Sequence, residues 1–341
     1  MTRLPPLDPA VAATRSAVRR ALRQATTSGG SATGHSDPAP LALVALSGGA
    51  DSLALAAAVA FETARLGWRG GAVIVDHQLQ ADSAQVAARA AAQAETLGLD
   101  PVVVRTVTVG HGDANGPEAA ARRARYRALE DARQATGAHL LLTAHTRDDQ
   151  AEQVLLALAR GSGTRALAGI PPARGPIRRP FLALSRHTTE RACAAQGLDP
   201  WLDPHNDDHR FARVRARREV LPALERHLGP GVSASLARTA ELAREDADAL
   251  DALAARVAAD LSRTDGDLVS LDVARLAMEP PAIRHRVIRR VARDRFGSHL
   301  SRTHTLQVAA LVTDWRGQGP IHVPGATVER ADGVLRFRGA G

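Results

Sequence analysis

Short apolar runs alternate with longer amphipathic stretches between residues 41 and 159. The runs predict strands at 41–46, 72–75, 102–109 and 139–144, and the amphipathic stretches predict helices at 50–66, 83–97, 117–135 and 148–159. The strands are continuously apolar rather than alternating, which is typical of a parallel sheet covered on both faces. Repeated strand–helix units of this kind predict a doubly wound α/β domain with its ligand at the carboxyl ends of the strands.

The pattern changes after Gly161, where Gly, Pro and Arg dominate as far as Pro180. Further helices are expected at 186–196, 211–227, 232–261, 282–296 and 301–315, followed by a hairpin of strands 321–323 and 334–337. Near the start, an amphipathic helix precedes a Gly/Ser/Thr/Pro-rich linker. The expected division is therefore an N-terminal helix and linker at 1–38, an α/β catalytic domain at 39–228, and a helical connector with a small α+β domain at 229–341.

Between the first strand and its helix the chain reads Ser-Gly-Gly-Ala-Asp-Ser, residues 47–52. Adjacent glycines let the backbone approach a ligand closely, and the amides at the start of the helix face whatever lies in the turn. Ser47 and Ser52 add hydroxyls, and Asp51 supplies a carboxylate for a metal ion or a proton. The turn predicts a pyrophosphate cradle, although an ordinary strand–helix turn can carry the same glycines. It resembles the PP-loop of the N-type ATP pyrophosphatases, which split ATP into AMP and pyrophosphate.

The composition excludes several classes of enzyme. The chain has no lysine, so all 44 of its Lys+Arg residues are arginine. A Walker A loop needs a lysine, and Schiff-base and lysyl-AMP chemistry need one too. The single cysteine, Cys193, excludes an intramolecular disulfide and a zinc site made of four cysteines.

The net charge of +8 indicates an anionic partner, with nucleic acid first in line. With five Phe, three Trp and one Tyr, the chain is poor in aromatic residues for base stacking. No stretch approaches the roughly 20 apolar residues of a membrane span, and no apolar leader follows Met1. We therefore expect a cytoplasmic protein without membrane partners.

Two further motifs close predicted strands. Asp76 and His77 end the second strand, where an adenine or ribose would lie, although a strand-end histidine is often only structural. After the fourth strand, Asp148 and Glu152 lie four residues apart on one face of the expected helix, where acidic residues also serve as caps. This helix ends in a second Gly/Ser loop, 160–164, which is suited to hold an anion or to close as a lid.

Arginines recur at helical spacing in the third predicted helix. Arg122 and Arg125 are one turn apart, next to Tyr126, and would form a fork for a phosphate. In a chain this rich in arginine, a solvated basic face is the strong alternative.

Taken together, these segments resemble the tRNA(Ile)-lysidine synthetase family. The resemblance rests on five segments in the expected order over about residues 40–220, namely SGGADS, VDH, EAAARRARY, TAHTRDDQAEQVLLALARGSG and WLDPHNDDHRFARVR. The C-terminal helices and the segment VPGATVERADGVLRFRG resemble the family's small first C-terminal domain. Thr146, Gln153 and Val214 depart from the residues usual in the family, which affects secondary contacts rather than the ATP chemistry.

The resemblance implies a reaction in two steps. The 2-carbonyl oxygen of the wobble cytidine, in an isoleucine tRNA with a CAU anticodon, attacks the α-phosphate of ATP and pyrophosphate leaves. The ε-amine of free L-lysine then displaces AMP to form lysidine. ATP and Mg²⁺ are the implied cofactors, and the tRNA and L-lysine are the implied partners; a homodimer is left open.

The resemblance also implies roles for particular residues. Asp51 is expected to organise the metal ion and, with Ser47 and Ser52, to serve catalysis. Three carboxylates are expected to bind the lysine: Asp148, Asp149 and Glu152. The expected ATP-binding residues are Ser47, Gly48, Gly49, Ala50, Asp51, Ser52, Asp76, His77, His145, Arg160 and Gly161. The expected tRNA-binding residues are Arg122, Arg125, Arg178, Arg179, Arg213, Arg215, Arg217, Arg289 and Arg290.

Three other classes of function compete with this interpretation. A PP-loop tRNA thiolase generally relies on several cysteines, and only Cys193 is present. An ammonia-using amidating synthetase would have little use for a basic accessory domain. A non-catalytic nucleotide-sensing or RNA-binding protein would have little use for both Asp51 and the acidic cluster. Pyrophosphate release that depends on tRNA and lysine would separate these classes.

Overall fold

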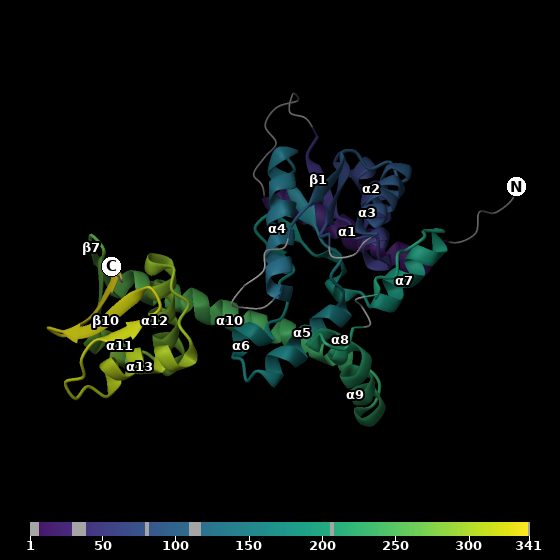
Figure 1. The fold of residues 1–341 in the computed structure, drawn as a ribbon. Helices are drawn as coiled ribbons and strands as arrows, with labels where there is room; N and C mark the ends of the chain where they lie inside the picture. The colour runs from purple at the N-terminus through teal and green to yellow at the C-terminus, as the bar shows by residue number, and fades with distance from the viewer. Residues whose placement is uncertain (1–6, 29–38, 79–81, 109–116, 205–207, 340–341) are drawn as a thin grey trace, which may run out of the picture. The chain divides into compact units, whose positions relative to one another are not determined.

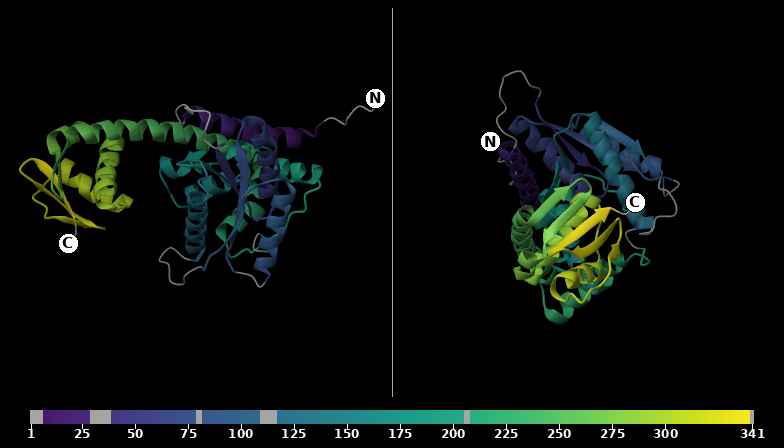
Figure 2. Two further views of the ribbon diagram at one scale, coloured as in Figure 1. Left: turned by 90° about the horizontal axis from the view of Figure 1, so that it is seen from above. Right: turned by 90° about the vertical axis from the view of Figure 1, so that its left-hand side faces the viewer.

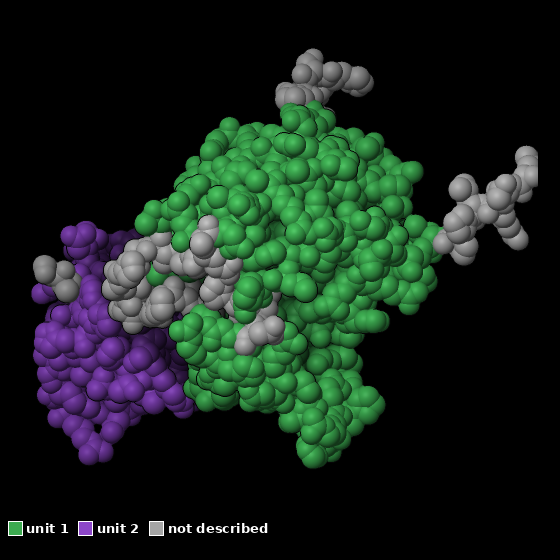
Figure 3. Space-filling model, turned by 45° about the vertical axis from the view of Figure 1, so that its right-hand side comes forward, with its two compact units in different colours: residues 1–241 green, residues 242–341 purple. Residues whose placement is uncertain are grey.

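The computed structural model describes residues 7–28, 39–78, 82–108, 117–204 and 208–339 (Figure 1). The chain forms two compact units, residues 1–241 and 242–341 (Figure 3). The division falls inside one long helix, α10 (Val232–Leu261). Within the described ranges, no helix has both the length and the apolar character needed to cross a membrane.

Unit 1 is built on a six-stranded sheet in the order β3-β2-β1-β4-β6-β5. Its strands are β1 (Leu41–Ala45), β2 (Arg69–Asp76), β3 (Val102–Thr106), β4 (Leu140–Leu142), β5 (Ala173–Arg174) and β6 (Ile177–Arg178). All neighbouring strands are parallel except β5 and β6, which are antiparallel. The predicted doubly wound parallel sheet is confirmed, and the short edge hairpin β5–β6 is an addition to it.

Helices follow the strands in the expected alternation. In unit 1 they are α1 (Pro9–Ser28), α2 (Ala50–Leu66), α3 (Ser83–Thr96), α4 (Pro117–Ala135), α5 (Arg147–Ala159), α6 (Thr164–Leu167), α7 (Arg186–Ala195), α8 (Ala212–Arg215), α9 (Leu221–Leu228) and the start of α10. A 3₁₀ turn, η1, covers Pro180–Ala183. A π-helical turn, Ala216–Val220, joins α8 to α9.

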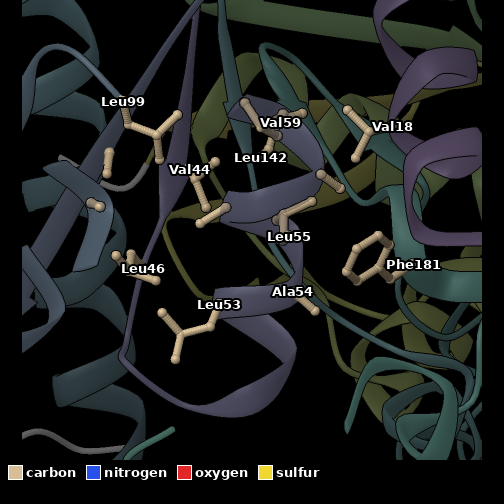
Figure 4. Close-up of a cluster of buried hydrophobic side chains, with 14 of the residues drawn as sticks. Val18, Val44, Leu46, Leu53, Ala54, Leu55, Val59, Leu99, Leu142 and Phe181 are labelled. Carbon is tan, nitrogen blue, oxygen red and sulfur yellow. The ribbon is translucent and has the colours of Figure 1, made fainter. Parts of the chain in front are cut away.

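Alternate residues of β1 enter two different cores, one on each face of the sheet. Val44 packs in the core with Leu53 and Leu55 of α2 (Figure 4). Leu43 packs in the other core with Leu129 of α4. Because all five residues of β1 are buried, an alternating pattern would have placed polar groups in one of these cores. Burial of each such leucine contributes about 2 kcal/mol.

The order of the strands creates a switch point between β1 and β4. From β1 the chain proceeds outward to β2 and β3, with α2 and α3 on one face, and then returns through α4, on the other face, to β4 (Figure 2). In such sheets the ligand binds outside the carboxyl ends of the strands at the point of reversal. The loops after β1 and after β4 therefore meet there, which brings together two segments separated by about a hundred residues of sequence.

Unit 2 contains a five-stranded antiparallel sheet in the order β7-β8-β11-β10-β9. Its strands are β7 (Ser262–Asp265), β8 (Leu268–Asp272), β9 (Ile321–Val323), β10 (Ala326–Ala331) and β11 (Val334–Gly339), and its helices are α11 (Val273–Met278), α12 (Pro281–Phe296), α13 (Arg302–Thr313) and the end of α10. Residues such as Ile288, Leu311 and Phe337 form its core. The expected small α+β domain is confirmed as a fold class.

The expected hairpin between 321–323 and 334–337 is wrong in its pairing. These two segments, β9 and β11, do not pair with each other, because β10 lies between them and pairs with both. The chain turns at Pro324-Gly325 between β9 and β10 and at Asp332-Gly333 between β10 and β11. The sequence of β10, ATVERA, buries only Ala326 and Val328, so its apolar signal is too short to stand out.

Candidate active site

The loop after β1 presents hydrogen-bond donors at the switch point. Gly48 has φ +83°, a left-handed conformation that favours glycine. Gly49 is the N-cap of α2 and gives it no side-chain cap, so the first amides of the helix point out of its N-terminus. The Ser47 and Ser52 hydroxyls lie 3.1 Å apart, and Ser52 Oγ donates to the Gly49 carbonyl at 2.9 Å. Amide and hydroxyl donors around one turn are what a phosphate site requires.

A cavity of about 210 Å³ lies beside this loop, at the carboxyl ends of β1 and β2. Leu46, Val86 and Leu129 give it an apolar lining, and Asp76 and His77 are among its polar residues. An apolar cavity with a few polar groups suits a purine base and its ribose. The two motif residues at the end of β2 thus line one cavity with Ser47 of the loop, and their contact with an adenosine stays a prediction.

Asp76 and His77 differ in their hydrogen bonding within the structure. Asp76 is buried, and its Oδ1 accepts a hydrogen bond from the Gln78 amide at 2.9 Å. Burial, helped by Arg125, lowers the pKa of His77, so its imidazole is neutral at physiological pH. Its buried Nδ1 has no hydrogen-bond partner among the residues that the structure describes, and it is available to a ligand.

A larger cleft of about 770 Å³ adjoins the cavity. Ser47, Arg125 and Trp201 border both spaces, so a ligand held at the loop can extend from one to the other. On its far side the cleft is lined by residues of the β4–α5 segment and of α7, α8 and α9, including His145, Asp149 and Arg186. The cleft therefore joins the phosphate loop to the acidic motif.

Arg186, the first residue of α7, lies among the carboxylates that the sequence singled out. Its guanidinium is 3.4 Å from Asp51 Oδ2, 3.0 Å from Asp149 Oδ1 and 3.5 Å from Glu152 Oε1. Its backbone amide donates to Asp148 Oδ2 at 2.8 Å. The four carboxylates thus form one cluster, held together by one arginine.

Glu152 is the most deeply buried carboxylate of the cluster, with an exposed fraction of 0%. Arg217 binds it through two nitrogens, at 2.6 Å and 3.2 Å. Arg213 Nε lies 3.7 Å from its second oxygen and also donates to Gln153 through Nη2 at 3.0 Å. Glu152 is therefore fully paired, and it does not itself border the cleft.

Arg213 and Arg217 are four residues apart, so they lie on one face of the helix and reach the same carboxylate, and a π-helical turn begins between them. Pro222, at the start of α9, has no amide hydrogen for the carbonyl one helical turn before it. The helix widens into a π turn over 216–220 just before this residue. Such turns are frequent at functional sites, and here Arg217, Arg218 and Pro222 all border the cleft.

Two carboxylates that border the cleft have shifted pKa values. Burial raises the pKa of Asp51, and its hydrogen bond from Thr189 and the charge of Arg186 offset this only in part. Burial acts in the same direction on Asp149, but Arg186, the Thr146 amide and other donors outweigh it and lower its pKa. Asp51 is thus the better proton acceptor, while Asp149 stays ionised.

Asp149 has a second role as a helix cap. Its Oδ2 accepts from the Thr146 amide at 2.8 Å, and the Thr146 side chain in turn accepts from the Asp149 amide, which completes a capping box at the start of α5. One oxygen caps the helix while the other faces Arg186. The capping and the binding interpretations of this motif are therefore compatible.

A basic wall faces the acidic cluster. Arg122 and Arg125 of α4 border the cleft, as does His145. Burial, together with the positive charges of Arg179, Arg125 and Arg122, lowers the pKa of His145 to about 3. Its Nδ1 lies 2.9 Å from the Thr143 hydroxyl. This side of the cleft holds positive charge and a neutral imidazole, so it is suited to an anionic substrate.

Several candidate residues lie away from the cleft lining. Arg160 and Gly161 are at the opposite end of α5 from the acidic motif, and neither borders either space. Arg178 and Arg215 donate to backbone carbonyls nearby, and buried Arg179 donates to the Pro171 carbonyl at 2.7 Å. In unit 2, Arg289 is exposed, and Arg290 pairs with Asp294 at 3.3 Å.

Sequence reasoning gave no role to three residues of the site: Arg186, Thr189 and Trp201. A signal existed for the first of them. An arginine in the first turn of a helix opposes the helix dipole, and such a charge is tolerated where carboxylates balance it, as they do around Arg186. Thr189 follows one turn later, and its hydroxyl donates to Asp51.

The fold and the loop define a class, the PP-loop ATP pyrophosphatases. A family model described as a PP-loop domain matches residues 16–224, and a model described as the TilS substrate binding domain matches residues 271–340. The solved U34-tRNA thiolase NcsA from Methanococcus maripaludis has a similar fold, with a TM-score of 0.52, 17% identity, and coverage of 69% of this chain and 80% of that one.

Sequence comparison narrows the class to one family. A tRNA(Ile)-lysidine synthase of Leifsonia xyli is 57% identical over 301 residues, which cover 88% of this chain and 90% of the relative. Those of Streptomyces coelicolor and Salinispora tropica are each 52% identical and cover 86% and 94% of this chain and 84% and 93% of their own length. The chain belongs to the tRNA(Ile)-lysidine synthase family, as the motifs predicted.

Proposed function

We propose that this chain joins L-lysine to carbon 2 of the wobble cytidine in an isoleucine tRNA with a CAU anticodon, using ATP. The observation that carries the proposal is the single cleft in which the loop at 47–52 meets Asp51, Asp149 and the arginines of α4. In this cleft the loop suits a phosphate, the carboxylates suit a cationic amine, and the arginines suit RNA. We also propose the cytoplasm as the compartment of this reaction.

In the first step, the ATP phosphates lie against the loop and the adenosine lies in the smaller cavity. The cytidine 2-carbonyl oxygen attacks the α-phosphorus, the bond to the β-phosphate oxygen breaks, and pyrophosphate leaves. Negative charge grows on the leaving group. The uncapped amides of α2 and the hydroxyls of Ser47 and Ser52 are positioned to stabilise that charge.

Asp51 would hold Mg²⁺ in this arrangement. Mg²⁺ is usually bound by one or two carboxylates and by the phosphates of its substrate rather than by a protein cage. The residues fit this mode, because the carboxylate of Asp51 borders the cleft beside the loop. The ion would neutralise charge on the phosphates.

The lysine cation would bind beside Arg186. Asp149 borders the cleft and carries an oxygen that already accepts a guanidinium, so an ammonium group is chemically acceptable there. Asp148 and Glu152 support it indirectly: the first binds the Arg186 amide, and the second fixes Arg217. We thus assign the direct contact to Asp149 and positioning to the other two carboxylates.

In the second step, the lysine ε-amine attacks carbon 2 of the activated cytidine, the carbon–oxygen bond breaks, and AMP leaves. The amine must first lose a proton. Asp51 is the better acceptor, because burial raises its pKa, whereas His145, with a pKa of about 3, is a weak base. Asp51 can take this role only while it is not bound to Mg²⁺, because the ion would lower its pKa. We therefore propose that His145 acts as a neutral hydrogen-bonding group.

The tRNA would follow the basic surfaces of the chain. Arg122, Arg125 and Arg218 border the cleft and would contact the anticodon loop. Arg289 and Arg290, in the part of the chain that matches the substrate binding domain, would contact phosphates elsewhere. Such contacts give affinity without sequence information, so discrimination of the cytidine falls to the cleft.

Cys193 argues against the alternative thiolase chemistry. This cysteine is buried, and burial raises the pKa of its thiol to about 11. A thiol of this kind is scarcely ionised at neutral pH and is a poor sulfur carrier. The single cysteine therefore packs as a small apolar residue rather than taking part in sulfur transfer.

The test is incorporation of labelled L-lysine into a transcript of an isoleucine tRNA with a CAU anticodon, in the presence of ATP and Mg²⁺. Controls are a transcript with uridine at the wobble position and an Asp51→Asn enzyme. Incorporation that disappears in both controls supports the proposal. Pyrophosphate release with another RNA or amine, and no lysine incorporation, would retain the ATP chemistry and refute the substrate.

A further inference from the structure

The segment 199–203, here called the strap, crosses directly over the phosphate loop. The Trp201 amide donates to the Gly48 carbonyl at 3.0 Å. A Cβ placed on Gly48 would lie 3.8 Å from Trp201 Cβ, and one on Gly49 would lie 4.0 Å from the Trp201 carbonyl oxygen. The strap thus touches both glycines of the loop, although about 150 residues separate them in sequence.

The strap is tied to α3 at its start. The Gln93 side-chain amide donates to the Asp199 carbonyl at 3.1 Å and accepts from the Asp199 amide at 3.3 Å. Arg89 donates to the same carbonyl at 3.3 Å and pairs with the Asp199 carboxylate. The Gln93 side-chain amide thus pairs with both the N–H and the C=O of Asp199, as a neighbouring β-strand would. This pairing fixes the position and the direction of the strap at Asp199.

Trp201 lies between the cavity and the cleft of the site. It borders both the cavity of about 210 Å³ and the cleft of about 770 Å³. In the proposed function, the adenosine occupies the first and the phosphates and cytidine meet in the second. Trp201 is therefore part of the wall shared by the nucleotide and the reacting centre.

We infer that Trp201 is a positioning residue for ATP. Its amide binds the Gly48 carbonyl, which turns that acceptor away from the phosphates and leaves the amides of the loop to face them. Trp201 also borders the adenosine cavity on the side of the cleft, and we assign its indole to that wall. The inference rests on the proposed binding of ATP at this loop and adds a residue to which neither the motifs nor the family models give a role.

The first experiment uses the three tryptophans of the chain, Trp68, Trp201 and Trp315. The full-length protein is titrated with a non-hydrolysable ATP analogue while tryptophan emission is recorded, and binding is measured in parallel by equilibrium dialysis. An adenosine against the indole should change the emission of Trp201 alone. The change is expected to persist in Trp68→Phe and Trp315→Phe and to vanish in Trp201→Phe, which still binds the analogue.

Two outcomes would overturn the inference. A change of emission that survives in Trp201→Phe places the nucleotide away from this indole, and so does binding by dialysis without any change of emission. Failure of the wild-type protein to bind the analogue refutes the proposed function itself, and the inference with it. Dialysis thus separates the two failures.

The second experiment separates positioning from a structural role. Trp201→Ala should raise KM for ATP about 5- to 10-fold, the value of one aromatic contact, with KM for lysine unchanged. Trp201→Phe should restore most of the loss. Gln93→Ala, which releases the strap and leaves the indole intact, should act in the same direction. If KM for lysine and KM for ATP change equally, or only the melting temperature falls, the role is structural and the inference is refuted.

Discussion

Arg186 and Asp51 lie 3.4 Å apart, guanidinium nitrogen to carboxylate oxygen, although one begins α7 and the other lies in the first turn of α2. The same guanidinium contacts Asp149 and Glu152. One arginine thus sets the charge of the proposed proton acceptor and of the carboxylate proposed to bind lysine. Because lysine is itself a cation, it must share or displace this guanidinium when it binds.

Removing the Arg186 charge should move the pH profile of the reaction. Arg186 lowers the pKa of Asp51, so Arg186→Gln should raise that pKa further. If ionised Asp51 accepts the proton, the acid limb of the rate moves to higher pH, and kcat at pH 7 falls about 100-fold through lost positioning as well. Arg186→Lys should restore the pH of the acid limb in part, because lysine keeps the positive charge but lacks the planar, two-pronged donor geometry of the guanidinium. An unmoved acid limb in Arg186→Gln would contradict the assignment.

Breaking the Glu152–Arg217 pair should cost stability rather than only activity. Glu152 is fully buried, and Arg217→Ala would leave its charge without its two-nitrogen partner. Loss of one partner of a buried pair typically costs about 3 kcal/mol or more. The measurement is urea unfolding of the full chain. The control is Arg210→Ala, which breaks the exposed pair with Asp208 and should cost less than about 1 kcal/mol; equal costs would contradict the buried role.

Sequence predicted the parallel sheet because its strands are buried on both faces. Every residue of β1 is buried, so its apolar run is unbroken and its position follows directly. Strands of unit 2 gave no such signal. β10 carries Glu329 and Arg330 beside only two buried residues, and β8 spans five residues with two buried. Short half-exposed strands depend on their neighbours in the sheet, which a local pattern does not contain.

The residues of the candidate site also divide into those that the sequence could predict and those that it could not. The residues at 47–52, 76–77 and 145–152 stand at strand ends, and the doubly wound topology alone brings them together. Arg186 is 135 residues from Asp51 in the sequence, and only the docking of α7 against α2 makes them neighbours. Trp201 depends in the same way on the tie between Asp199 and α3. Contacts that arise from packing leave little trace in a single sequence.

His145 should make the protein less stable in acid. Burial lowers its pKa in the folded state to about 3, whereas an unfolded histidine titrates near 6.5. Between these values the unfolded chain binds a proton that the folded chain does not, so stability falls as pH drops from about 6.5 toward 3. His145→Gln should flatten this part of the curve in thermal unfolding measured against pH. An equal effect of His187→Gln, at an exposed position, would show that the slope has another source.

The two glycines of the loop should respond differently to alanine. Gly48 has φ +83°, where an alanine costs about 1–2 kcal/mol, so Gly48→Ala should raise KM for ATP about 5- to 30-fold. Gly49 has φ −74°, and a Cβ there lies 3.7 Å from the Ser47 hydroxyl, an ordinary contact. Gly49→Ala should therefore have a clearly smaller effect. Equal increases would mean that space for the phosphates, and not backbone conformation, explains the glycines.

Arg289 and Arg290 offer a matched pair for testing tRNA binding by unit 2. Arg290 is paired with Asp294 at 3.3 Å, so part of its charge is already balanced. Partial desolvation lowers the pKa of Arg289, although the residue as a whole is exposed; Arg286 and Arg302 lower it further and Asp251 opposes them, so its surroundings are short of negative charge. A phosphate of the tRNA would supply the missing negative charge. Arg289→Ala should weaken tRNA binding and reduce the slope of log K against log salt by nearly one unit.

Arg290→Ala should change that salt slope less, because Asp294 competes with a phosphate for the Arg290 guanidinium, so Arg290 contributes less to phosphate binding in the first place. The measurement is tRNA binding by filter retention over a series of salt concentrations, with lysine incorporation into saturating tRNA as the check that the catalytic unit is intact. If the two variants reduce the slope equally, the ion pair with Asp294 does not screen Arg290. If neither changes it, the phosphate contacts of this unit lie on other arginines.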